Sequence, residues 1–278
     1  MDSVTTLALI VLVWFVFYGL IKLLKVDSPD LEISPFYALF KSTKLNKFIE
    51  RLAMWNPRFW RILGNIGVAL SIGEAAFASW LLSANLLRFF FRPDEATPVQ
   101  PLIPGVTIGI SSLPWFLLAA GVVILTHELS HGIQCVLEGI KVKSSAILVA
   151  VITFGGAVEP DEEQLKSAPL MSRLRIFASG SVVNLIIGLV ILAVLVFSNR
   201  LLPSQISIFF SWLYFVSVNL AIMNMLPIGP LDGGQMWRAV TGNMKMGKSL
   251  QTVATYGFIA LIVGNILFSM STFGLIPL

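Results

Sequence analysis

The chain alternates between long apolar runs and short polar connections, and six of the runs are long enough to cross a membrane. Each holds roughly 20 mostly apolar residues, the length that an α-helix needs to span the hydrocarbon core. This pattern predicts an all-α polytopic membrane protein. The six predicted spans run approximately over Val4–Leu24, Ile62–Leu87, Leu113–Leu137, Leu174–Phe197, Ile206–Leu226 and Ala254–Phe273.

One further apolar segment, Ser144–Val158, lies between the third and fourth spans. Its 15 residues are too few to cross as a helix, and they are rich in β-branched side chains and end near Gly155-Gly156. The segment therefore predicts a short re-entrant, β-hairpin-like element. Such backbone is tolerated at membrane depth only where protein or water satisfies its polar groups.

A basic amphipathic segment, Ser34–Met54, follows the first span. Ser34 can cap a helix, and Pro35 suits a first helical turn. Helical spacing would place five apolar side chains on one face, namely Phe36, Phe40, Phe48, Ile49 and Leu52. We expect a helix that lies along the membrane surface, with a packing and anchoring role rather than a regulatory one.

Composition and charge agree with this organisation. Hydrophobic residues make up 56% of the chain and charged residues 12%, about half the share usual in soluble proteins. If the six spans alternate, 16 of the 19 Lys and Arg residues fall on one side, which leaves Arg88, Arg92 and Arg200 for the other. The side with 16 basic residues is predicted to be cytoplasmic, with both termini outside. The net charge of +4 then reflects topology and indicates no nucleic-acid partner.

The boundaries of the spans suggest three regions. Residues 1–112 would hold the first two spans and the amphipathic helix, residues 113–240 a core of three spans, and residues 241–278 the last span. The first run lacks a basic head and a small-residue cleavage site, so we expect a retained span rather than a removed signal peptide. The single Cys135 excludes an internal disulfide.

The candidate chemistry begins with the chain's two histidines, His127 and His131, which enclose Glu128 in the pentapeptide His-Glu-Leu-Ser-His of the third span. Residues four apart share one helix face, so both imidazoles can reach one metal ion. Glu128 can then reach a water at that ion. This H-E-x-x-H pattern is typical of zinc hydrolases. The alternative is a pair of hydrogen-bonded core histidines.

A zinc site of this kind needs a third protein ligand, and Asp232 is the candidate. It follows the fifth span, where Pro227 and Pro230 must break the helix. Such a break can turn the carboxylate inward. In the predicted topology Asp232 and both histidines lie in the same membrane leaflet. A surface Asp in a turn is the alternative.

These residues resemble the paired motifs of the site-2 protease family, which are intramembrane zinc metalloproteases. The matching motifs are His127-Glu-Leu-Ser-His-Gly132, Asn224-x-x-Pro227-x-x-x-Leu231-Asp232-Gly233 and Gly180-x-x-x-Asn184. The resemblance covers about Leu113–Gly234 and implies a three-helix catalytic core. Many relatives carry a PDZ or CBS domain, for which these 278 residues leave no room, so the chain resembles the minimal, mostly prokaryotic and archaeal members.

The resemblance implies a role for each motif residue. Glu128 would act as general base, and one zinc ion would be held by His127, His131 and Asp232. An oxyanion also needs a donor besides the metal; Asn184 is the first candidate and Asn224 the second, although either could simply bond a neighbouring helix. Gly180, Pro227 and Gly233 would be structural.

The substrate would be a transmembrane protein in the same bilayer, cut near its cytoplasmic side in regulated intramembrane proteolysis. Because a helix shields its own backbone, the substrate must unwind locally, and Ser144–Val158 could pair with it as a strand. A plain packing hairpin is the alternative.

Two rival functions are weaker. A transporter would show broken helices in both halves of a repeat, and only the break at Pro227 is evident. An inactive adaptor would have lost the base, but Glu128 is present.

Two further residues stay outside these roles. Cys135 shares the face of His131 and is interpreted as a small buried thiol. Glu74 in the second span either gates access or is neutral and hydrogen-bonded to Asn65 or to a neighbouring helix.

Overall fold

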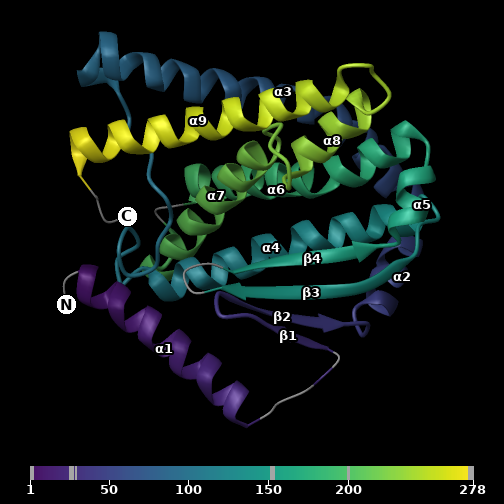
Figure 1. Cartoon of the computed structure of the whole chain (residues 1–278), viewed down its shortest axis with the longest axis horizontal. Coiled ribbons are helices and arrows are strands. Elements are labelled where there is room, and N and C mark those ends of the chain that lie inside the picture. Colours follow the sequence, from purple (N-terminus) through teal and green to yellow (C-terminus); the bar gives the residue numbers. More distant parts are fainter. Residues whose placement is uncertain (1–2, 25–27, 29, 151–153, 199–200, 275–278) are drawn as a thin grey trace.

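The computed structural model describes the chain in five stretches: residues 3–24, 28, 30–150, 154–198 and 201–274. Within them lie nine α-helices, one short 3-10 helix (η1, Pro93–Glu95) and four strands (Figure 1). The helices are α1 (Ser3–Leu23), α2 (Asn46–Trp55), α3 (Pro57–Phe91), α4 (Leu113–Leu137), α5 (Glu162–Ser167), α6 (Leu170–Ser198), α7 (Ser204–Asn224), α8 (Asp232–Thr241) and α9 (Gly247–Phe273). The strands are β1 (Leu31–Ile33), β2 (Tyr37–Ser42), β3 (Val142–Ala150) and β4 (Phe154–Pro160).

Five helices are long and apolar enough to cross a membrane, namely α3, α4, α6, α7 and α9. They correspond to the second to sixth predicted spans, which confirms a polytopic, mainly helical membrane protein. The first predicted span coincides with α1. The described apolar part of α1, Ala8–Leu23, is shorter than the five helices and is not counted among those long enough to cross. At about 1.5 Å per residue, the 35-residue α3 is longer than the hydrocarbon core is thick, so it must tilt or protrude.

Three helices, α4, α6 and α7, pack against one another and form the centre of the molecule (Figure 1). Phe116 and Val123 of α4 share an apolar core with Leu213 and Val216 of α7. On one side α3 packs against α6, with α9 beside α3; on the other side the sheet covers α4. The predicted three-helix core therefore has a helical layer on one face and a sheet on the other.

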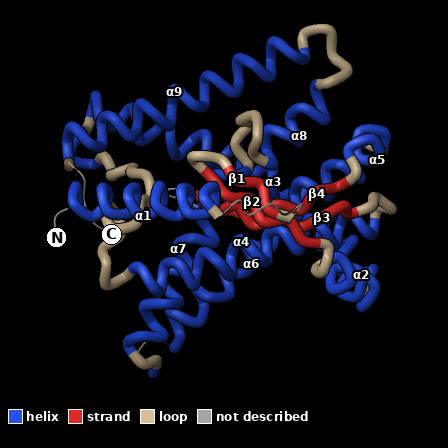
Figure 2. Tube along the Cα trace, turned by 60° about the horizontal axis from the view of Figure 1, so that its bottom comes forward, coloured by secondary structure: helices blue, strands red, loops and turns tan. Residues whose placement is uncertain are grey.

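The predicted hairpin forms: β3 and β4 pair antiparallel, from Val142 opposite Pro160 to Val149 opposite Phe154. Both Gly155 and Gly156 lie inside β4 rather than in the turn. The hairpin is part of a four-stranded sheet in the order β1-β2-β3-β4, which leaves β4 as an edge strand among the described residues (Figure 1). Figure 2 shows the strands gathered in one group among the helices.

The predicted helix over Ser34–Met54 is wrong in its first half. Tyr37–Ser42 is strand β2, which pairs residue for residue with β3 from Tyr37–Ala150 to Ser42–Ser145, and the helix begins only at Asn46. The aromatic and alternating character of the segment suits a strand as well as a helix face. A partner strand about a hundred positions away decides between them. The remaining helix, α2, buries Ile49 against Gly132 of α4.

A buried amide pair joins α3 to α9, and this contact is testable. Asn265 is fully buried; its Nδ2 donates to Leu82 O at 3.0 Å, and its Oδ1 accepts from Asn85 Nδ2 at 3.0 Å. We expect Asn265→Ala to lower the free energy of unfolding by about 1 kcal/mol, seen as a lower thermal midpoint in detergent. Asn219→Ala is the matched control, because among the described residues that exposed amide donates only to Phe215 O of its own helix. Equal shifts in both variants would contradict the prediction.

Candidate metal centre

The two histidines project from one face of α4, as their spacing predicts. Their ring centroids lie 4.7 Å apart, and His127 Nε2 lies 3.1 Å from His131 Nε2. His127 is 5% exposed, so both nitrogens meet in a largely buried position. Two imidazole nitrogens directed at the same point can share one metal ion.

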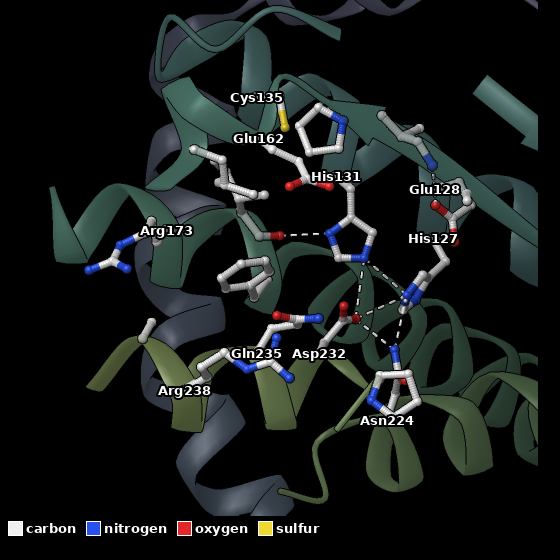
Figure 3. Close-up of a pocket in the computed structure, with 18 of the residues that line it drawn as sticks. His127, Glu128, His131, Cys135, Glu162, Arg173, Asn224, Asp232, Gln235 and Arg238 are labelled. Carbon is white, nitrogen blue, oxygen red and sulfur yellow. Dashed lines mark hydrogen bonds and ion pairs between the residues drawn. The ribbon is translucent and has the colours of Figure 1, made fainter. Parts of the chain in front are cut away.

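Asp232, the first residue of α8, brings the third ligating atom to this point (Figure 3). Its Oδ2 lies 3.1 Å from His127 Nε2 and 3.2 Å from His131 Nε2. The three atoms thus form a nearly equilateral triangle. Tetrahedral zinc with bonds of about 2.0 Å separates its ligands by roughly 3.3 Å, so both the size of the triangle and its donor set fit zinc.

The backbone around Asp232 explains how a carboxylate outside the spanning helices reaches the histidines. Helix α7 ends at Asn224, and the loop containing Pro227 leads directly into α8. Gly233 and Gly234 make this turn possible, because a Cβ at either would overlap backbone atoms of residues 225–229. Burial alone would raise the pKa of the Asp232 carboxyl, but the adjacent histidines hold that pKa below its usual range.

The second nitrogen of each imidazole is also held. Nδ1 of His131 lies 2.7 Å from Ile176 O; an N–H donated there leaves Nε2 as the free lone pair. Nδ1 of His127 lies 2.9 Å from the Asn184 Nδ2, while the buried Oδ1 of Asn184 has no partner within the described chain. Turning this amide over would let Oδ1 accept Nδ1–H, which satisfies both groups and frees Nε2 for a metal.

The two candidate oxyanion donors therefore differ. Asn184 is fully buried behind His127, and its contacts favour a role in fixing that imidazole. Asn224 lines the cavity beside the triangle, where its Nδ2 donates to Asp232 Oδ2 at 2.6 Å and lies 3.1 Å from His127 Nε2. A role as oxyanion donor stays a prediction for Asn224.

Glu128 faces the same cavity and is held by the sheet. Its Oε2 accepts a hydrogen bond of 2.8 Å from the Val158 N–H of β4. A Cβ at Gly156 would lie only 2.8 Å from Glu128 Cγ, so this glycine allows β4 to pass close to the carboxylate. Neither β4 contact was predicted from the sequence. Both contacts depend on the pairing register of the hairpin, which the spacing of residues in the sequence does not fix.

A cavity of about 730 Å³ opens onto the triangle. Its walls come from α4, β4, α5, α6, α8 and the end of α7, so the sheet and the helices enclose it together (Figure 3). Cys135 lines the cavity but is not one of the ligating atoms. Glu74 of α3 does not line it; its buried Oε1 has no partner among the described residues, and its predicted bond to Asn65 is absent there.

The site combines two imidazoles, a carboxylate beside their nitrogens and a second carboxylate nearby, and it lies among helices long enough to cross a membrane. This combination is typical of membrane-embedded metallohydrolases. Residues 115–201 and 199–265 match the model of peptidase family M50. These segments cover more than half of the chain, which therefore belongs to peptidase family M50, the site-2 protease family.

Individual relatives agree with this assignment. A membrane-bound transcription factor site-2 protease homolog of Arabidopsis thaliana is 26% identical over 206 residues, which are 73% of this chain and 38% of that protein. A zinc metalloprotease of Methanocaldococcus jannaschii is 28% identical over 160 residues, 56% of this chain and 44% of that protein. The chain spans less than half the length of these two relatives.

Close packing of α6 on the candidate ligand His127 gives a testable prediction. A Cβ at Gly180 would overlap the His127 imidazole, so Gly180→Ala must displace the ring. We expect zinc affinity to fall about 10- to 100-fold, measured by competition with a chelating dye. Gly121→Ala is the control on α4 itself, because its added Cβ meets no atom within 4 Å. Unchanged affinity of Gly180→Ala would show that the imidazole does not depend on this contact.

Proposed function

We propose that the protein is an intramembrane zinc metalloprotease that hydrolyses a peptide bond in or near a transmembrane segment of a membrane-anchored substrate. The observation that carries this proposal is the triangle of His127 Nε2, His131 Nε2 and Asp232 Oδ2 with sides of 3.1 to 3.2 Å. This triangle has the size and the donor set of a zinc site, and Glu128, the residue after His127, places a second carboxylate beside it. Family membership supports the same chemistry.

A zinc ion held by these three residues would supply a Lewis acid and a water whose pKa is lowered towards neutrality. Glu128 accepts the proton of the attacking water and then passes it to the leaving amine. Its bond to Val158 N–H keeps the carboxylate directed into the cavity. Asn224, whose amide lies at the same corner, would donate to the oxyanion of the peptide.

The edge strand β4 suits an extended substrate. Successive residues of a strand direct their N–H groups to alternate edges, so the outward N–H of Val158 implies that Gly156 N–H points the same way. A substrate segment that has lost its helix could pair with this edge beside Glu128. Pairing of this kind would place the scissile carbonyl next to the metal without the help of a separate binding domain.

The basic loops would lie on the cytoplasmic side, with the opening of the site facing that side. Substrate cleavage would then release a segment toward the cytoplasm, as in regulated intramembrane proteolysis. Labelling of single introduced cysteines in intact cells tests the orientation.

The central test separates metal binding from catalysis. Glu128→Gln removes the base but none of the three ligating atoms, so we expect zinc content to stay at one ion per chain while cleavage of single-span substrates falls at least about 10³-fold. Zinc is quantified in purified protein, and cleavage is followed by mass spectrometry. Absence of zinc from well-folded wild type, even after metal is added, would sink the proposal.

A second test concerns how β4 positions the base. In Gly156→Ala the new Cβ would meet Glu128 Cγ and Ile124, so we expect kcat/KM to fall about tenfold or more while zinc content is retained. Gly155→Ala is the matched control, since its Cβ meets nothing closer than Leu148 at 3.9 Å. Equal effects of the two variants would show that the strand, rather than the contact with the base, is what matters.

A further inference from the structure

The cavity has a second end, away from the ligand triangle, and that end is basic. Arg173 at the start of α6 and Arg238 on α8 both line the cavity, as does Lys166 of α5. Figure 3 shows Arg173 and Arg238 at the side of the cavity opposite Glu128. A ligand that fills the whole cavity would therefore contact both the candidate metal site and these cations.

Two of these cations are not neutralised. Lys166 Nζ pairs with Glu162 at 2.7 Å, so this exposed pair carries no net charge. In contrast, no carboxylate of the described chain lies within 4.0 Å of Arg173 or Arg238. Arg173 Nε is buried without a hydrogen-bond partner among the described residues, and Arg238 makes one long bond, of 3.3 Å, to Gly229 O.

The acidic groups of the cavity do not offset this charge once a metal is bound. Asp232 and Glu128 together carry two negative charges, which a divalent ion at the triangle balances. Arg173 and Arg238 then leave an excess of two positive charges. Positive residues near a membrane surface usually set topology, but topology alone does not require two arginines without a carboxylate partner along the cavity that contains the candidate metal site, Arg173 half-buried and Arg238 exposed.

Helix geometry sets the distance between the two ends. Asp232, Gln235 and Arg238 are spaced by three and line the cavity from one face of α8. Asp232 and Arg238 are separated by six residues, a rise of about 9 Å. An extended peptide advances roughly 3.3 Å per residue, so Arg238 lies about three substrate residues from the position of the metal.

We infer, building on the proposed function, that Arg173 and Arg238 select substrates carrying Asp or Glu about three residues from the scissile bond. A guanidinium group binds a carboxylate through two parallel hydrogen bonds. Apart from the long bond from Arg238 to Gly229 O, neither arginine donates to an acceptor among the described residues. A polypeptide is favoured over an anionic lipid headgroup, because an extended chain can reach from the arginines to the candidate metal site along the cavity.

Cleavage of a set of synthetic single-span peptides in detergent, with the zinc-loaded enzyme, tests this inference. One Glu is moved stepwise through the flanking segment of the peptide, and a second series carries Gln at the same positions. We expect the cleaved bond to move with Glu at a constant spacing and the Gln series to be cut about five- to tenfold more slowly. Equal rates and a fixed cleavage position in both series would overturn the inference.

The matched variants assign the effect to the two arginines. Arg173→Gln/Arg238→Gln should cut both series at the slow rate of the Gln series, whereas Lys245→Gln/Lys248→Gln, which removes the same charge outside the cavity, should behave as wild type. A loss of the Glu preference in both double variants would mean that overall charge, not the cavity, is responsible. A defect of the arginine variant seen only in vesicles containing phosphatidylglycerol would assign the arginines to lipid and overturn the inference.

A binding measurement separates this inference from the proposed function. In the Glu128→Gln background, fluorescence anisotropy with the labelled Glu and Gln peptides reports selection without cleavage. Tighter binding of the Glu peptides, lost in Arg173→Gln/Arg238→Gln, supports the inference even if wild type cleaves no peptide, an outcome that would count against the proposed function alone. Equal affinities overturn the inference whether or not cleavage occurs.

Discussion

The close approach of His127, His131 and Asp232 is the interaction on which the rest of the site depends. Two imidazole nitrogens and a carboxylate oxygen share a buried point with separations of 3.1 to 3.2 Å. Placing them there costs desolvation energy unless charge and hydrogen bonds are balanced. The surrounding sequence supplies that balance: Ile176 O and Asn184 hold the outer ring nitrogens, and Gly180 leaves room for the His127 imidazole.

The membrane sets the second constraint. Backbone within the hydrocarbon region must be hydrogen-bonded inside the protein, so irregular structure is tolerated only where other elements enclose it. The break after α7 satisfies this rule, because Leu226 and Ile228 pack against Ala78 and Leu82 of α3. The sheet satisfies it differently: β2 and β3 are paired on both edges, β1 and β4 are paired on one edge, and the Val158 N–H on the outer edge of β4 is accepted by Glu128.

Features set by local sequence could be predicted, whereas those set by distant pairing could not. Apolar run length located the spans, and helical spacing brought the two histidines together. The break at Pro227 indicated how Asp232 joins them. Strand β2 was missed because its partner, β3, is about a hundred residues away, and aromatic residues suit either structure. The contact of Gly156 with Glu128 depends on strand register, which no local pattern encodes.

The bond between Val158 N–H and Glu128 Oε2 would link substrate binding to chemistry if the proposed substrate pairs with β4. If an extended substrate pairs with β4, its backbone must approach the outward Val158 N–H, which is the group that holds the Glu128 carboxylate. The new strand and Glu128 then compete for the same donor, so docking would release the carboxylate at the moment when a peptide carbonyl reaches the metal. Binding energy gained along the strand would thus be used to activate the base, in the way that enzymes use remote contacts to lower the barrier at the reacting centre.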